Sequence, residues 1–111
     1  MTRAPQDHLS GSLDMLVLQS LSLEERHGFD VAQWVHERTR RVLRTPDGAL
    51  YKSLHRLEER GLVAARWGRS ATGRKAKYYR LTTRGDAALR DEKEAWATFS
   101  KAITRALKAE S

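Results

Sequence analysis

Apolar residues recur at helical spacing in the first part of the chain. Residues 12–23 carry a wide apolar face of Leu13, Leu16, Val17, Leu18, Leu21 and Leu23. This spacing predicts a buried helix, with Ser10 or Ser12 as its N-cap. After the polar break at 24–28, the pattern predicts a second helix from about Phe29 to Arg38. Its core-facing residues are expected to be Phe29, Ala32 and Val35, together with Val31 or Trp34.

A third helix is predicted to begin at Thr45, Pro46 and Asp47 and to run to about Arg60. Threonine suits an N-cap, proline the first helical position, and an acid the first turn. Leu50, Leu54 and Leu57 fall within one narrow stripe at about 100° per residue. Gly61 is expected to end the helix in a left-handed conformation. The opposite face carries Gly48, Lys52, His55, Arg56 and Glu59, with Tyr51 on its flank.

Two short strands and a long helix complete the pattern. Residues 62–67 and 76–82 are predicted strands, and the glycine and polar residues at 68–75 between them predict a β-hairpin. Thr82 or Thr83 is expected to cap a helix that reaches Ala109. Its large apolar residues, spaced as in a helix-packing seam, are Leu89, Trp96, Phe99, Ile103 and Leu107.

The predicted fold is mainly α with a small β-hairpin (α+β), because three helices followed by a hairpin are the order of a winged helix-turn-helix. At 111 residues the chain is expected to form one folding unit. Residues 1–82 would be the winged helix-turn-helix DNA-binding domain. Residues 83–111 would be a C-terminal dimerisation helix packed on the same domain.

Charge is unevenly distributed along the chain. The formal net charge is +7, yet residues 60–85 contain no Asp or Glu and eight basic residues, so the remainder carries −1. Clustered cations often only solvate a surface. Here they alternate with Trp67, Tyr78 and Tyr79 in a strand-like context, which favours a polyanion-binding surface.

Other function classes find little support in the sequence. There is no cysteine, the four histidines lack zinc-ligand spacing, and no nucleophile elbow or phosphate loop occurs. We therefore expect no enzyme activity, no metal and no cofactor. No apolar run approaches the roughly 20 residues of a membrane span, and residues 1–11 do not resemble a signal peptide. We expect no membrane association and a cytoplasmic location.

A specific resemblance lies in the third helix and the hairpin. Residues 48–63, GALYKSLHRLEERGLV, followed by residues 77–85, KYYRLTTRG, resemble the PadR family of bacterial transcriptional regulators. HGFD at 27–30 and LDMLVL at 13–18 are similar to that family too. The resemblance covers roughly residues 11–96. It implies transcription regulation by a homodimer that binds double-stranded DNA, and repression by occupying a promoter.

One position departs from the family pattern, which commonly has proline after the tyrosine of the third helix. Lys52 stands there instead, and it adds a flexible cation and a backbone donor on the side away from the leucine stripe. The resemblance implies a phosphate contact by the Tyr51 hydroxyl, whereas the plain interpretation is an amphipathic tyrosine at the edge of the core.

The candidate DNA-binding residues lie on the third helix and the hairpin. Lys52 and His55 would reach base edges or phosphates, while the hairpin cations would bind phosphates. The full predicted set is Gly48, Tyr51, Lys52, His55, Arg56, Arg74, Lys75 and Lys77. Glu58 and Glu59 would repel phosphates, so we assign them structural or solvent-facing roles. Tyr79 and Leu81 are expected to anchor the hairpin.

The predicted dimerisation residues are Leu89, Trp96, Phe99, Ile103 and Leu107. Trp96 has a second interpretation, because drug-responsive members of the family imply a stacking platform for a small planar effector near the dimer axis. Trp34 and Trp67 are alternatives for lining such a site. Two other functions stay open: a sequence-independent architectural protein, and a winged-helix protein-interaction module.

Overall fold

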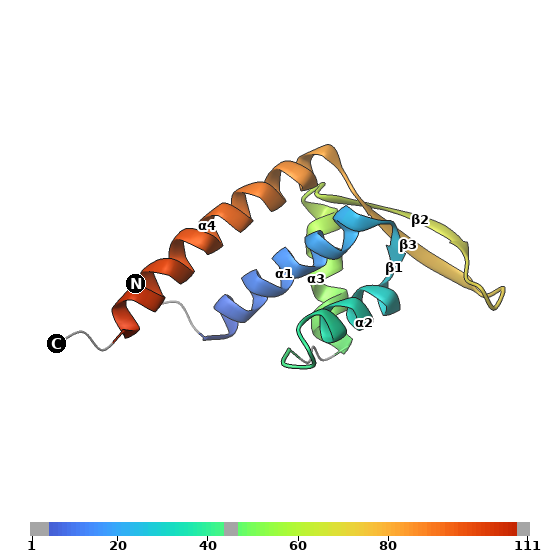
Figure 1. The fold of residues 1–111 in the computed structure, drawn as a ribbon. Coiled ribbons are helices and arrows are strands. Elements are labelled where there is room, and N and C mark those ends of the chain that lie inside the picture. The colour runs from blue at the N-terminus through green and yellow to red at the C-terminus, as the bar shows by residue number, and fades with distance from the viewer. Residues whose placement is uncertain (1–4, 44–46, 109–111) are drawn as a thin grey trace.

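The computed structural model describes residues 5–43 and 47–108, with residues 5–11 and Asp47 described by their backbone alone. In chain order the elements are α1 (Pro5–Leu23), β1 (Arg26–His27), α2 (Gly28–Arg38), α3 (Asp47–Glu59), β2 (Val63–Arg69), β3 (Lys75–Leu81) and α4 (Thr83–Leu107) (Figure 1). The predicted mainly α fold with a β-hairpin is confirmed.

The helix ends agree with the sequence signals in part. The Oγ1 of Thr82 accepts a hydrogen bond from the backbone N–H of Gly85 at 3.0 Å, so the predicted cap of α4 is confirmed. The predicted buried helix at the start of the chain is confirmed, but its N-cap at Ser10 or Ser12 was wrong, because α1 begins at Pro5 and continues through both serines. The predicted start of α3 at Thr45 and Pro46, and the predicted end of α4 at Ala109, lie outside the described residues.

The sheet has one strand more than the predicted hairpin. Strand β1 pairs antiparallel with β3 through Arg26 opposite Tyr79 and His27 opposite Tyr78, which gives the order β1-β3-β2. Within the hairpin, Trp67 stands opposite Lys77 and Ala65 opposite Tyr79. A strand of two residues is too short to produce an alternating pattern, so the sequence offered no signal for β1.

The core lies where α1, α2 and α3 meet the base of the hairpin. The predicted leucine stripe of α3 is confirmed, with Leu50, Leu54 and Leu57 at most 1% exposed. They pack in one apolar cluster with side chains of α1, α2, the sheet and α4, including Val17, Leu18, Val31, Val63, Tyr79 and Leu89. All three core-facing leucines follow the spacing of four and three that one helix face requires.

Phe29 is a correction, because it was expected in the core and is 62% exposed. Helix α2 instead buries Gly28, Val31 and Val35. At 100° per residue Phe29 lies about 160° around the helix from Val31, on the far side of the buried stripe. A helical wheel centred on the two valines would have placed it correctly.

Two glycines set how the hairpin leaves the helical body. Gly61 follows α3 with φ +75°, so the predicted left-handed helix end is confirmed. Gly85 lies in the first turn of α4, where a Cβ would stand 1.9 Å from the carbonyl oxygen of Leu62. The same carbonyl accepts hydrogen bonds from the backbone N–H and the hydroxyl of Thr82. This close junction aligns the start of β2 with the start of α4.

Helix α4 and the hairpin extend in opposite directions from the core. α4 lies alongside α1, and the hairpin projects from the other end of the molecule (Figure 1). Within the described residues no helix is long and apolar enough to cross a membrane.

Candidate nucleic-acid interface

The outward face of α3 carries polar and aromatic side chains above the buried leucines. Tyr51 is 53% exposed, and Lys52, His55 and Arg56 are exposed with it. Together with Tyr79 these residues line a shallow hollow of about 570 Å³. Gly48 is also exposed, one turn before Lys52, and a Cβ there would meet nothing within 4 Å. α3 therefore turns a polar face outward and an apolar face toward the core, and a single helix of this kind fits the major groove of DNA.

Tyr51 is positioned by the start of α2. A Cβ at Gly28 would stand 2.8 Å from the Cε1 atom of Tyr51, so the missing side chain leaves room for the phenol ring. Gly28 itself is buried. The predicted phosphate-binding residue is thus held against the neighbouring helix at its ring, while half of its surface stays open to solvent.

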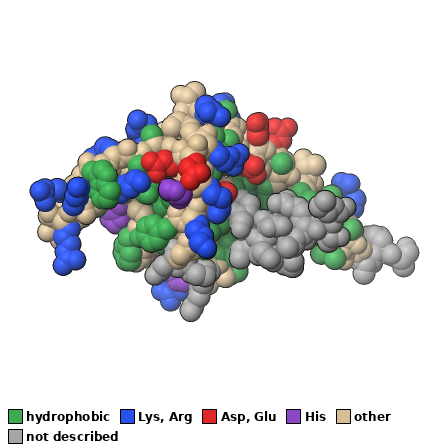
Figure 2. Space-filling view, turned by 180° about the vertical axis from the view of Figure 1, so that it is seen from behind, with side chains coloured by type: hydrophobic (Ala, Val, Ile, Leu, Met, Phe, Trp, Pro, Cys, Tyr) green, Lys and Arg blue, Asp and Glu red, His purple; other side chains and the backbone are tan. Residues whose placement is uncertain are grey.

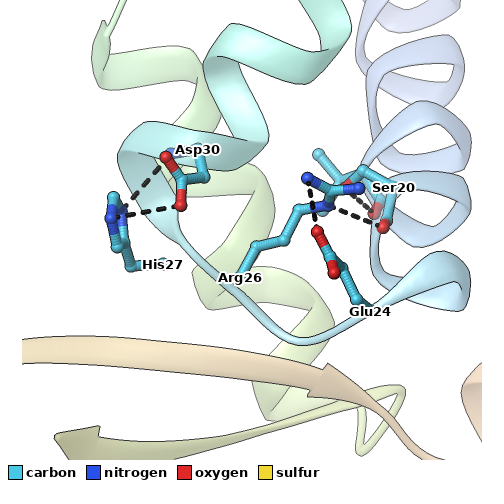
Figure 3. Close-up of polar contacts among 6 residues, drawn as sticks. Ser20, Glu24, Arg26, His27 and Asp30 are labelled. Carbon is cyan, nitrogen blue, oxygen red and sulfur yellow. Dashed lines mark hydrogen bonds and ion pairs between the residues drawn. The ribbon is translucent and has the colours of Figure 1, made fainter. Parts of the chain in front are cut away.

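Contacts at the junction of α1, β1 and α2 hold Gly28 in place (Figure 3). Arg26 donates from Nε to the carbonyl oxygen of Ser20 at 3.0 Å and pairs with Glu24 at 3.4 Å. His27 caps α2, because its Nδ1 accepts a hydrogen bond from the backbone N–H of Asp30 at 3.3 Å. Its Nε2 lies 3.2 Å from the Asp30 carboxylate. The chain is therefore anchored on both sides of β1.

The tip of the hairpin carries exposed cations. Arg74 and Lys75 are exposed, and the turn before them closes through Gly73 at φ +83°. The Lys75 ammonium lies 5.0 Å from the centre of the Trp67 ring. In the space-filling view, Lys and Arg side chains gather over the end to which the hairpin projects (Figure 2).

Three of the predicted DNA-binding cations have carboxylate partners within the chain. His55 Nε2 lies 2.9 Å from Glu59, Arg56 Nη2 lies 2.7 Å from Asp14, and Lys77 Nζ lies 3.2 Å from Glu58. Glu58, which was assigned a structural or solvent-facing role from the sequence, is the partner of Lys77. The bond to Glu58 raises the pKa of Lys77 above its usual value. By contrast, Lys52, Arg74 and Lys75 have no ion pair among the described side chains.

The hairpin pairs with α3 through Lys77 and Glu58, and another ion pair joins it to the connection between α1 and β1. The guanidinium of Arg66 donates to both carboxylate oxygens of Glu25, at 2.9 and 2.5 Å, and lies 5.0 Å from the Tyr78 ring centre. This bidentate bond lowers the pKa of Glu25 and raises that of Arg66. Glu25 and Arg66 are 41 residues apart in sequence. No local pattern could have identified this pair.

The apolar side chains of α4 divide into two groups. Leu89 is 3% exposed and belongs to the core of its own chain, so the predicted intersubunit contact by this residue is not available in this conformation. The other four predicted dimerisation residues are exposed: Trp96 at 48%, Phe99 at 49%, Ile103 at 43% and Leu107 at 78%. Trp96 and Phe99 pack together with ring centres 6.0 Å apart.

The remaining tryptophans occupy different surroundings. Trp34 is half-buried, with the guanidinium groups of Arg26 and Arg38 each 6.0 Å from its ring centre. Trp67 is 62% exposed on the hairpin. Among the side chains that the structure describes, no three His, Asp or Glu residues gather as metal ligands would.

An outward helix face beside a basic hairpin defines a winged-helix protein of the DNA-binding kind. The comparisons with known proteins identify its family, since residues 17–91 match the transcriptional regulator PadR-like family. The chain belongs to the PadR family of transcriptional regulators.

Individual relatives agree with this assignment. The chain is 33% identical over 87 residues to a transcriptional regulator of Mycobacterium tuberculosis, covering 78% of each protein. It is 31% identical over 97 residues to the uncharacterised protein X of Lysinibacillus sphaericus, covering 87% of this chain and 89% of that protein. A PadR family transcription regulator from Clostridium difficile has a similar structure, with a TM-score of 0.76, 28% identity, and coverage of 86% of this chain and 98% of that one.

Proposed function

We propose that this regulator binds a palindromic DNA operator as a homodimer and represses transcription by occupying the promoter. Helix α3 would enter the major groove with Lys52 and His55 toward the base edges. Arg74 and Lys75 would bind phosphates next to it.

The DNA-binding part of the proposal rests on one observation, which is where the candidate cations without ion pairs lie in the fold. Of the candidate DNA-binding cations, Lys52, Arg74 and Lys75 have no ion pair among the described side chains. Lys52 lies on α3, and Arg74 and Lys75 lie at the tip of the hairpin, and these are the two elements that a winged helix presents to DNA. Three other candidate cations already have carboxylates within hydrogen-bond reach. A phosphate would compete with those carboxylates, whereas it would meet the three unpaired cations directly.

The dimer is supported by the apolar seam of α4, which comprises Trp96, Phe99, Ile103 and Leu107. The helix has 25 residues and is therefore about 37 Å long. Residues 91–99 are all exposed within one chain. The four large apolar side chains of the seam are exposed as well, and they lie on one face of the helix. A face of this kind is typical of a helix that packs against a partner. A two-fold dimer places the same surface twice on one side of the DNA.

Selection of bound duplexes from a random pool tests the operator. We expect an inverted repeat whose half-sites are separated by one helical turn, about 34 Å, or a multiple of it. Lys52→Ala should change the selected bases, while Lys75→Ala should weaken all duplexes alike. Uniform competition by non-specific DNA would favour the architectural alternative. Absence of any duplex binding at low salt would favour the protein-interaction module.

Sedimentation tests the dimer. Replacing Phe99 and Ile103 with glutamate places charges in the seam and should produce monomers. Lys101→Glu is a matched control, since residue 101 lies about 160° around the helix from Phe99 and is exposed. Dimers of the double variant would contradict the seam assignment.

A planar effector would act through the same seam. Trp96 and Phe99 present half of their surfaces to solvent, so a dimer would bring two such pairs together. A ligand stacked there would change the spacing of the two α3 helices and thereby the DNA affinity. The ligand's affinity should fall in Trp96→Ala. Because Trp96 also belongs to the seam, the comparison is made at protein concentrations where sedimentation shows parent and variant to be dimeric.

A further inference from the structure

Three exposed aromatic side chains line one cleft between the helical body and the hairpin. Phe29 and Trp67 are each 62% exposed and Tyr51 is 53% exposed. They come from α2, β2 and α3, and together with neighbouring cations they enclose a cleft of about 440 Å³. We call this region the aromatic cleft. Its aromatic residues are separated widely in sequence, so only the fold brings them together.

The cleft is built by backbone features that bring the aromatic rings close. The absent side chain of Gly28 admits the Tyr51 ring at the base. Strand alternation puts Trp67 on the same hairpin face as Ala65, which packs on the core, and opposite Lys77. The Trp67 indole is therefore directed to the body side of the hairpin, beyond the end of the core. Its exposure means that it does not serve as a core anchor.

The Lys and Arg side chains that line the cleft are not matched by acidic ones among the lining residues. Arg74, Lys75 and Lys77 line it, and no Asp or Glu is among its lining residues. Lys75 stands over the Trp67 ring at 5.0 Å. Lys77 already pairs with Glu58, with its Nζ 3.2 Å from the carboxylate. Arg74 and Lys75 are therefore the lining cations available to an anion. An occupant with negative charge and apolar faces complements this surface.

The position of the cleft between α3 and the hairpin indicates which molecule would bind there. If α3 fills the major groove and the hairpin reaches the next minor groove, the strand that separates these grooves must cross between them. That strand offers phosphates alternating with the apolar faces of deoxyribose. The aromatic cleft lies between α3 and the hairpin and combines cations with aromatic rings in the same way.

We propose that the aromatic cleft binds the sugar–phosphate backbone of one DNA strand, with Trp67 and Phe29 against deoxyribose and with Lys75 and Arg74 on the flanking phosphates. This inference rests on the proposed function, because it requires duplex binding by α3 and the hairpin. It assigns two aromatic residues as DNA contacts. Phe29 was expected in the core, and Trp67 was named only as part of the basic segment and as an alternative for lining an effector site. Such contacts add affinity without selecting a base sequence.

The first test measures binding by variants. Trp67→Ala should weaken specific and non-specific duplexes alike, by about tenfold, which is toward the lower end of the loss caused by removing an aromatic side chain that stacks on a base. The dependence on salt should stay unchanged, because an indole releases no counterion. Trp67→Phe should retain most of the affinity. Lys75→Met should instead reduce the slope of log K against log salt by about 0.9.

The second test observes the indole in the otherwise unchanged protein. With 5-fluorotryptophan at all three tryptophans, the ¹⁹F resonances are assigned by replacing each tryptophan in turn with phenylalanine. Adding duplex should shift the Trp67 resonance and reduce its sensitivity to exchange of H₂O for D₂O. The half-buried Trp34 serves as the internal reference.

The outcomes separate this inference from the proposed function. If the parent binds duplex while the Trp67 resonance is unmoved and Trp67→Ala binds like the parent, the cleft assignment is wrong and DNA binding stands. If the parent binds no duplex at all, both fail together. A selective shift of the Trp67 resonance, together with weaker duplex binding and an unchanged salt slope in Trp67→Ala, supports the cleft.

Discussion

Replacement of Asp14 by alanine should destabilise the protein through a buried hydroxyl on the neighbouring helix. Asp14 Oδ1 on α1 accepts from the Oγ of Ser53 at 2.5 Å and from Nη2 of Arg56 at 2.7 Å. Ser53 is 0% exposed, so its hydroxyl cannot turn to water once the carboxylate is gone. The one carboxylate therefore serves both a buried donor and an exposed cation of α3.

The expected magnitude follows from these two contacts. A hydrogen bond to a charged group contributes about 1.5–3 kcal/mol, and an orphaned buried hydroxyl costs about 1–3 kcal/mol. Both figures describe the loss of the one hydrogen bond between Ser53 and Asp14, so the expected cost is either figure and not their sum. The pair with Arg56 adds at most about 1 kcal/mol, because that side chain is 45% exposed. We expect Asp14→Ala to lower the free energy of unfolding by about 2–3 kcal/mol.

Urea denaturation at one fixed protein concentration measures this change, since any association of subunits makes stability concentration-dependent. With an m-value of about 1.5 kcal/mol/M, the midpoint should fall by roughly 1.3–2 M. Asp14→Asn keeps an acceptor for Ser53 and should cost less. Asp91→Ala, at an exposed aspartate of α4, is the matched control and should stay within about 0.5 kcal/mol of the parent.

A double-mutant cycle with Ser53→Ala gives the decisive result. Once Asp14 is alanine, removing the orphaned hydroxyl should cost little or even restore stability, so the two changes should be coupled by about 1 kcal/mol or more. If the double variant instead shows the sum of the single losses within about 0.5 kcal/mol, the hydrogen bond does not carry the effect and the reasoning is refuted.

Three further predictions concern the hairpin and its attachment. Gly85→Ala should destabilise by about 1–3 kcal/mol despite alanine's higher helix propensity, because its Cβ would stand 1.9 Å from the Leu62 oxygen; thermal unfolding checks this, and an unchanged midpoint would contradict it. Lys77→Met should leave the salt slope of DNA binding nearly unchanged, whereas Glu58→Gln should steepen it by up to about 0.9, because Lys77 is then released to phosphate; titrations at several salt concentrations decide between these slopes. The pKa of Glu25 is lowered in the folded state, so its ion pair stabilises above the ordinary value of 4.5 and is lost as pH falls through the folded pKa; the stability difference between the parent and Glu25→Gln should shrink on acidification, and a constant difference would oppose this.

The residues of the candidate interface were predictable to different degrees. The exposed face of α3 followed from Leu50, Leu54 and Leu57, because the buried stripe of a helix also defines its opposite face. The exposed cations at the hairpin tip followed from the acid-free segment. The aromatic cleft did not, since Phe29 was placed in the core and its approach to Tyr51 depends on how α2 packs on α3.

The sequence by itself determined the order of the main elements, a threonine cap at Thr82 or Thr83, the helix end at Gly61 and the location of the excess positive charge. These are local properties, decided by side-chain periodicity and by residues within one helical turn. Tertiary structure decided which charges remain available to DNA. Glu25 with Arg66, Asp14 with Arg56, and Glu58 with Lys77 meet across 41, 42 and 19 residues of chain. A pairing at that separation depends on how helices and strands pack, and no spacing along the chain encodes it.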